Sequence, residues 1–265
     1  MKKSKLSKTR QFIINNIAFA IPIIFFVLGF ILVPKPVMEK IIHSSPIQIF
    51  KSHEEKIFDK YKNYIFGIDV SHYQNKINWS RLGKLPDNND ISFVFVRASV
   101  GSDTEDRYFK YNWEKAKAYG YIRGAYHYYR PDENSISQAD NFISIVHLQK
   151  GDLPPVLDIE KESSIQSMAR LKQGLKKWLD KVEKHYGMTP IIYTGDTYYR
   201  DFLNDTYFRK YKFWIANYNK VFEPNHNQWI FWQFTQNGKL KGINHKVDFN
   251  VFRGNINDLL KITKK

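Results

Sequence analysis

The sequence contains no cysteine, which excludes a disulfide framework and any metal site built on thiolates. Acidic side chains are also scarce, because 26 Asp and Glu stand against 41 Lys and Arg, a formal net charge of +15. Internal repeats and low-complexity tracts are not evident. A chain of 265 residues with 43% hydrophobic content is long enough for one large domain, alone or with a membrane anchor.

The first residues carry a basic cluster followed by a long apolar run. The cluster lies within residues 1–11, and the run from Phe12 to Val33 would rise roughly 33 Å as a helix, enough to cross a bilayer. No small-residue cleavage site of the A-x-A kind follows, so an uncleaved signal anchor is favoured over a cleaved signal peptide or a buried core helix. Basic flanks of a membrane span stay on the cytoplasmic side. The sequence therefore predicts a single-pass membrane protein whose N-terminus lies in the cytoplasm.

Beyond the anchor, residues 34–62 are polar and rich in lysine, and we interpret them as a stalk leading to a domain over 63–265. Without the five basic residues of the tail the chain still carries +10. That charge favours an anionic surface or polymer as partner: acidic cell-wall glycan, the membrane's own headgroups or, least of all, nucleic acid, for which no binding motif is visible. The domain is expected outside the cytoplasm, in a periplasm or on a cell surface, as a monomer.

Short apolar runs alternate with segments of helical periodicity from residue 65 onward. The expected strands are 65–70, 93–98, 123–128, 155–160, 190–193, 213–216, 229–234 and 247–251. The expected helices are 108–119, 137–148, 165–186 and, shorter, 197–203, with Gly120 and Gly187 marking two helix ends. The alternation predicts an α/β fold with a parallel sheet closed into an eight-stranded barrel, in which the last strands lack full helices.

Two carboxylates lie two residues apart in Pro154-Pro155-Val156-Leu157-Asp158-Ile159-Glu160. Side chains alternate along a strand, so Asp158 and Glu160 share one face. Burying two acids is costly unless they are paired, protonated or catalytic. An active site is therefore favoured, and the alternative is that Asp158 caps a helix whose first turn holds Glu160.

The active site of such a barrel lies at the carboxyl ends of its strands. Asp69, Asp158, Glu160 and Asp248 are all placed there by the expected strands. A carboxyl crowded by others and partly desolvated holds its proton near neutral pH while its neighbour stays ionised, and glycoside hydrolysis needs that division. Aromatic and polar side chains expected to contact a sugar crowd the same region: Tyr126, Tyr128, Tyr193, Trp214, Trp232, Gln233 and His72. Core packing is the alternative for each aromatic residue.

Six segments in order carry a family resemblance: Gly67-Ile68-Asp69-Val70-Ser71-His72, Ile77-Asn78-Trp79, Gly124-Ala125-Tyr126-His127-Tyr128, Asp158-Ile159-Glu160, Trp232-Gln233 and Val247-Asp248-Phe249-Asn250. Together they resemble glycoside hydrolase family 25, the Chalaropsis-type lysozymes, over residues 64–253. The resemblance implies a flattened eight-stranded barrel with about five helices, and cleavage of the β-1,4 bond from N-acetylmuramic acid to N-acetylglucosamine in peptidoglycan, without a cofactor.

The resemblance also implies roles for the four acids. Glu160 matches the general acid, and Asp158 matches the carboxylate that orients the substrate's 2-acetamido group for attack on the anomeric carbon, with retention. Asp69 and Asp248 match two further active-site acids. Two other functions stay open: a metal-assisted hydrolase using His72 and His127 with nearby acids, and a catalytically idle, membrane-tethered glycan-binding module.

Overall fold

The computed structural model describes residues 51–218 and 221–265. Its described part forms one compact unit that begins at Ser52. In these two ranges no helix is long and apolar enough to cross a membrane. The cytoplasmic tail expected at 1–11, the anchor expected at 12–33 and the first part of the expected stalk lie outside the described residues.

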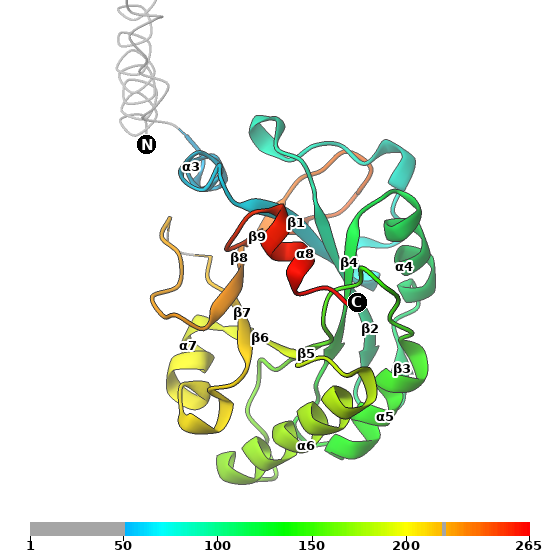
Figure 1. Cartoon of the computed structure of the whole chain (residues 1–265), viewed down its shortest axis with the longest axis vertical. Coiled ribbons are helices and arrows are strands. Elements are labelled where there is room, and N and C mark those ends of the chain that lie inside the picture. Colours follow the sequence, from blue (N-terminus) through cyan, green and yellow to red (C-terminus); the bar gives the residue numbers. More distant parts are fainter. Residues whose placement is uncertain (1–50, 219–220) are drawn as a thin grey trace, which may run out of the picture. The chain divides into compact units, whose positions relative to one another are not determined.

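Eight strands close into a barrel, as the alternation of segments predicts (Figure 1). The described residues contain nine strands, of which all but β3 belong to the barrel: β1 (Ile65–Val70), β2 (Phe93–Val100), β3 (Thr104–Glu105), β4 (Ile122–Tyr128), β5 (Val156–Asp158), β6 (Ile191–Gly195), β7 (Lys212–Ala216), β8 (Trp229–Gly238) and β9 (Val247–Phe252). The order is β1-β9-β8-β7-β6-β5-β4-β2, and pairing of β1 with β2 completes the ring. The two-residue β3 is a ninth strand, attached to the edge of β2 outside the ring.

One strand breaks the expected parallel order. Strand β9 runs antiparallel to both of its neighbours, β1 and β8, whereas the other barrel pairs are parallel. Residues 239–246 between β8 and β9 contain no helix, and an antiparallel neighbour can be reached by such a short connection. Asp248 lies at the start of β9, so the expectation that it lies at the carboxyl end of its own strand is wrong. The reversed direction of β9 nevertheless brings Asp248 opposite Asp69, at the same mouth.

The expected helices are present: α4 (Phe109–Ala118), α5 (Ser135–Ile145), α6 (Met168–Tyr186) and the short α7 (Asp196–Tyr198), which continues as a π-helical turn, η5 (Tyr199–Leu203). Gly187 ends α6 with φ of 66°, a left-handed conformation in which glycine carries no steric penalty. No helix separates β7 from β8 within the described residues, so the helical ring is incomplete there, as expected. Short 3₁₀ turns add η2 (His72–Gln74), η3 (Trp79–Arg81), η4 (Pro86–Asn88) and η6 (Thr206–Phe208).

Two helices were not expected from the sequence. Helix α3 (His53–Lys60) occupies the end of the expected stalk, where a capping box between Ser52 and Glu55 starts it and its Ile57 and Phe58 are fully buried. Phe58 packs against Phe66 of β1 at 4.7 Å between ring centroids. The compact unit thus begins at Ser52 and not at residue 63. Helix α8 (Ile256–Lys261) follows β9.

The barrel interior is filled and cannot serve as a channel. Its aromatic layers include Phe95 stacked on Trp214 at 4.5 Å, and Leu259 of α8 belongs to the same buried cluster at one end. A second cluster lies between the strands and the surrounding helices, and includes Leu157, Ile159 and Trp178. Side chains of β5 thus alternate between the two clusters as a strand requires, with Val156 inside and Leu157 outside. The filled interior leaves the other end of the barrel as the floor of a cavity.

Candidate active site

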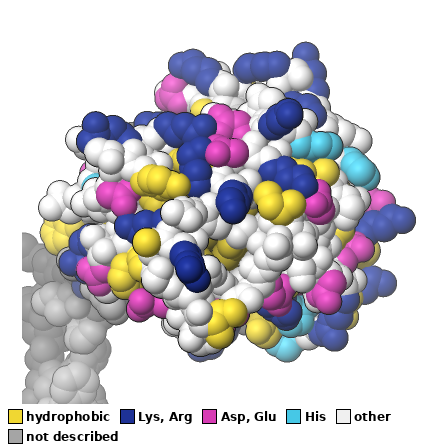
Figure 2. Space-filling view, turned by 90° about the horizontal axis from the view of Figure 1, so that it is seen from below, with side chains coloured by type: hydrophobic (Ala, Val, Ile, Leu, Met, Phe, Trp, Pro, Cys, Tyr) yellow, Lys and Arg dark blue, Asp and Glu magenta, His cyan; other side chains and the backbone are white. Residues whose placement is uncertain are grey.

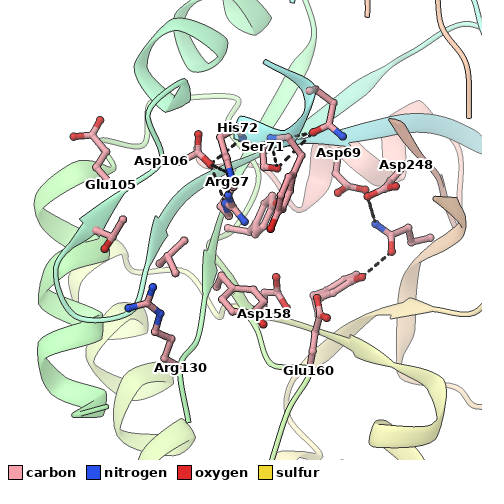
Figure 3. Close-up of a pocket in the computed structure, with 18 of the residues that line it drawn as sticks. Asp69, Ser71, His72, Arg97, Glu105, Asp106, Arg130, Asp158, Glu160 and Asp248 are labelled. Atoms are coloured by element: carbon pink, nitrogen blue, oxygen red, sulfur yellow. Dashed lines mark hydrogen bonds and ion pairs between the residues drawn. The ribbon is translucent and has the colours of Figure 1, made fainter. Parts of the chain in front are cut away.

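The four predicted acids line one open cavity of about 710 Å³ at the mouth of the barrel (Figure 3). Asp69 lies near the end of β1 and directly opposite Asp248 in the antiparallel register. Asp158 ends β5, and Glu160 follows it by two residues. The next helix starts only at Met168 with Ser167 as its cap, so the helix-capping alternative for Asp158 is wrong. The predicted convergence of these acids is confirmed.

Asp69 and Asp248 form a pair held by amide groups. Gln233 Nε2 donates to Asp69 Oδ2 at 2.7 Å and to Asp248 Oδ2 at 3.2 Å, and Asn250 Nδ2 donates to Asp69 Oδ2 at 2.7 Å. Burial raises the pKa of Asp69 to about 6, against the effect of these hydrogen bonds. Burial and the neighbouring charge of Asp69 raise the pKa of Asp248 to about 9. Near neutral pH the two carboxyls therefore share one proton, held mainly by Asp248.

Asp158 and Glu160 form the second pair. Asp158 is 4% exposed, and burial followed by the charge of Glu160 raises its pKa well above the ordinary value. The surrounding protein atoms also raise the pKa of Glu160, although this side chain lies at the exposed rim, and a hydrogen bond to Asp158 acts in the opposite direction. Asp158 Oδ1 is buried and has no hydrogen-bond partner. Both carboxyls of the pair therefore have a raised pKa, and Asp158 keeps one buried oxygen without a partner.

A buried cation that the motifs did not include lies beside these acids. Arg97 of β2 donates through Nε to Asp106 Oδ2 at 2.9 Å, and its Nη2 contacts His72 Nδ1. Asp106 also accepts from the backbone N–H of His72 at 3.0 Å. The positive charge of Arg97 lowers the pKa of both Asp158 and Glu160, against the larger effect of burial. A charged residue inside the apolar run Phe93–Val100 was the sequence signal for this group.

Six of the seven side chains expected to contact a sugar line the cavity. Tyr126, Tyr128, Tyr193, Trp214, Gln233 and His72 all do so. Tyr193 Oη donates to Gln233 Oε1 at 2.7 Å, and Tyr218 Oη donates to the same atom at 2.6 Å, which leaves the Gln233 amide oriented toward the acids. Trp214 is 1% exposed, so it forms part of the floor and offers little stacking surface.

The seventh, Trp232, lies outside the cavity, and its predicted contact with the substrate is wrong. It is fully buried, its Nε1 donates to the Asn217 carbonyl at 2.9 Å, and it packs edge-on against Tyr61 of the segment after α3. Gln233, the next residue of β8, points to the acids. Alternation along the strand places these neighbours on opposite faces, so they could not both reach the cavity.

His127 is likewise remote from the acids. It is fully buried, its two ring nitrogens contact Ser99 Oγ at 2.8 Å and Gln138 Oε1 at 3.1 Å, and it stacks on Trp178. Burial lowers its pKa to about 4. In the described ranges no group of three or more His, Asp or Glu residues is arranged to hold a metal ion. The metal-assisted alternative that combined His72 with His127 thus loses one of its two histidines.

Comparison with known proteins gives consistent matches across the barrel. Residues 68–243 match the family described as Glycosyl hydrolases family 25. The uncharacterised protein YegX of Escherichia coli K12 is 40% identical over 197 residues, which is 74% of this chain and 72% of YegX. Lysozyme M1 of Streptomyces globisporus is 31% identical over 210 residues, 74% of this chain and 70% of that protein. The structure of a family 25 glycosyl hydrolase from Bacillus anthracis superposes with a TM-score of 0.68 at 31% identity, covering 77% of this chain and 95% of that one.

Proposed function

The chain belongs to glycosyl hydrolase family 25, and from this membership we propose that it is an N-acetylmuramidase of the Chalaropsis type. It would cleave the β-1,4 bond from N-acetylmuramic acid to N-acetylglucosamine in peptidoglycan. The observation that carries the proposal is the pair of Asp158 and Glu160 at the open cavity, both with a raised pKa. An idle glycan-binding module would have no use for two neighbouring carboxyls whose pKa values are both raised.

Glu160 acts as the general acid in this proposal. It lies at the exposed rim of the cavity, where a glycosidic oxygen can reach it, while Asp158 lies deeper. Its raised pKa keeps the carboxyl protonated at a higher pH than an ordinary glutamate, so it can deliver a proton as the bond breaks. General acid catalysis of this kind contributes roughly 10²- to 10⁴-fold to the rate.

Asp158 positions the substrate's 2-acetamido group. Its Oδ1 is a buried acceptor without a partner, and the acetamido N–H is a donor of the right kind. A donated hydrogen bond favours the ionised form of a carboxyl, so substrate binding would lower the pKa of Asp158 and move the proton of the pair toward Glu160. The acetamido oxygen would then attack the anomeric carbon, and water would open the resulting ring with net retention.

Asp69 and Asp248 stabilise positive charge in the transition state. They share one proton near neutral pH, so the pair carries about one negative charge, fixed by Gln233 and Asn250. A fixed negative charge beside the sugar ring stabilises an oxocarbenium-like centre without having to reorganise during the reaction.

The substitution Glu160→Gln tests this assignment. The amide cannot donate a carboxylic proton, so turnover of purified peptidoglycan should fall by roughly 10²- to 10⁴-fold. Because Glu160 lies at the exposed rim and in no core cluster, thermal unfolding and sedimentation with insoluble wall should stay as in the wild type. Retained lysis by this variant would contradict the role of Glu160.

The N-terminal segment supplies the location in our proposal. Residues 12–33 would form an uncleaved, single-pass signal anchor, with residues 1–11 in the cytoplasm and the hydrolase domain outside it. The linker would run from residue 34 only to the start of the compact unit at Ser52. Mass spectrometry of the protein from its own membrane tests this: an intact N-terminus is expected, and a mature N-terminus beyond Val33 would refute the anchor.

A further inference from the structure

The substrate groove continues past the main cavity. A second hollow of about 490 Å³ lies against it and shares Glu160 and Tyr193 as lining residues. Its other walls come from the turn after β6, from β7 and from Tyr218. The two hollows thus form one groove with an arm on either side of Glu160.

The first arm, within the main cavity, is lined by four cations, namely Arg97, Arg107, Arg130 and Lys161. Figure 3 shows two of them, Arg97 and Arg130. Arg97 is neutralised by Asp106 at 2.9 Å, and Arg130 is paired with Glu133 at 2.9 Å. Arg107 has a neutral partner instead, since its Nη2 donates to Asn75 Oδ1 at 3.0 Å. Neither Arg107 nor Lys161 forms an ion pair with a described residue, and Glu105 is the one exposed acid that lines this arm apart from Glu160. Arg107 and Lys161 are therefore the two cations of this arm that no carboxylate of a described residue pairs.

The second arm has the opposite character. Glu162 and Asp201 line it, and among the described residues no lysine or arginine does. Lys161 and Glu162 are consecutive in the chain, yet each lines a different arm. The two residues that follow Glu160 therefore place an unpaired lysine in the first arm and a glutamate in the second. Such a difference attracts an anionic group to one arm and repels it from the other.

We propose that the cationic arm binds a carboxylate carried by the muramyl residue of the substrate, with the Arg107 guanidinium as its principal donor. This inference rests on the proposed muramidase function. The glycan backbone is otherwise uncharged, and the 3-O-lactyl substituent of each muramyl residue is where its anionic groups are found. The carboxylate has two sources: the free lactyl group of a peptide-free strand, or the stem peptide attached to that group.

Arg107 suits this role because it is anchored but not neutralised. The bond to Asn75 uses one of its five N–H donors, and its guanidinium lies over the Tyr108 ring at 5.0 Å. The remaining donors are free to take a carboxylate in a two-pronged arrangement, which a guanidinium matches better than an ammonium group.

Hydrolysis of chemically modified strands tests the proposal. Peptide-free and peptide-bearing glycan strands are each compared before and after their carboxylates are converted to methylamides. For the wild type, amidation should raise KM about tenfold with little change in kcat. Arg107→Gln should show that higher KM on unmodified strands and no further rise on amidation. Arg107→Lys should recover part of the loss, and Arg81→Gln, at an exposed arginine outside the groove, should match the wild type.

The pattern of the result identifies the source. An amidation effect on peptide-free strands assigns the lactyl carboxylate, and an effect confined to peptide-bearing strands assigns the stem peptide. Two outcomes would overturn the proposal while leaving the muramidase function intact. One is an equal KM of the wild type before and after amidation, and the other is an Arg107→Gln variant whose KM responds to amidation as much as that of the wild type. If the wild type cleaves none of the strands, the proposed function fails. In that case the binding of the same strands is measured by sedimentation with the Glu160→Gln variant and with the double variant Glu160→Gln/Arg107→Gln. Weaker binding by the double variant would support the inference, and equal binding would overturn it.

Discussion

At the scale of single residues, the site depends on where four carboxyls keep their protons. Asp158 and Asp248 are the two whose pKa burial raises most clearly, and each has an acidic neighbour whose charge adds to the effect. Asp69 and Asp248 thus share one proton near neutral pH, and the pKa values of Asp158 and Glu160 are both raised. In the proposed mechanism Glu160 must carry a proton, and substrate contact with Asp158 is the event that would move one toward it.

The raised pKa of Asp248 lowers the stability of the folded protein at neutral pH, and the substitution Asp248→Asn should show by how much. The pKa of Asp248 is near its ordinary value of 3.8 in the unfolded chain and about 9 in the folded protein. The folded state therefore binds more protons between these values, and its stability falls as the pH rises through them. Asparagine does not titrate, and it can still accept from Gln233 and donate to Asp69. The variant should be more stable than the wild type by at least about 1.4 kcal/mol at pH 7, and by almost nothing at pH 3.

Thermal unfolding at pH 3, 5 and 7 measures this difference. The exposed Asp87→Asn substitution is the matched control and should leave the unfolding temperature within about 1 °C of the wild type throughout, since exposed surface changes have small effects. A gap between Asp248→Asn and the wild type that is the same at pH 3 and pH 7 would contradict the shared-proton arrangement.

Sequence reasoning reached the acids but not every neighbour. Asp69, Asp158 and Glu160 were predictable because short motifs place them at the carboxyl ends of strands, whereas Asp248 reaches the same mouth only because β9 is antiparallel. The prediction for Trp232 was wrong because Trp232 and Gln233 are consecutive on a strand. Their side chains point to opposite faces, so only one of them can face the cavity. Arg97 was missed although a charged residue inside an apolar strand was a signal for it. The Arg107 and Lys161 side chains of the cationic arm could not be inferred without knowing which loops meet at the mouth.

At the scale of secondary-structure elements, hydrophobic periodicity predicted all eight barrel strands and the three long helices. It could not predict the direction of β9, because an apolar run reads the same whether its neighbour is parallel or antiparallel. Helix α3 was missed because only Ile57 and Phe58 of its eight residues are buried, so the segment is as polar overall as a linker. Its burial becomes visible only when β1, β8 and β9 supply Phe66, Phe234 and Phe249 around Phe58.

Helix α3 should therefore belong to the folding unit. A chain of residues 63–265 lacks Ile57 and Phe58 and should unfold at a clearly lower temperature than one of residues 52–265. Within the longer chain, Phe58→Ala should cost about 3 to 5 kcal/mol of unfolding free energy, because a fully buried ring is lost and a cavity remains. Denaturant unfolding measures this loss, with the exposed Lys56→Ala as control. Equal stability of the two chains would show that α3 is a linker after all.

At the scale of the whole molecule, positive charge is spread over the surface, and one arm of the groove holds two cations, Arg107 and Lys161, that form no ion pair with a described residue. Figure 2 shows Lys and Arg side chains across one face, with Asp and Glu side chains among them. Some surface charges form ion pairs, such as Lys210 with Glu183 at 2.6 Å, which contribute little to stability. Their combined field would hold the enzyme near an anionic wall, while the groove alone selects the bond that is cut.

Identification of the new chain ends in digested peptidoglycan is the most direct test of the central claim. The full-length protein is incubated with purified wall, the products are reduced with borohydride, and the reduced sugars are identified by mass spectrometry. An N-acetylmuramidase leaves reduced muramic acid at the new ends, and this is the result we predict. Reduced glucosamine ends would contradict it, because the bond on the other side of the muramyl residue would then be the one that Glu160 cleaves.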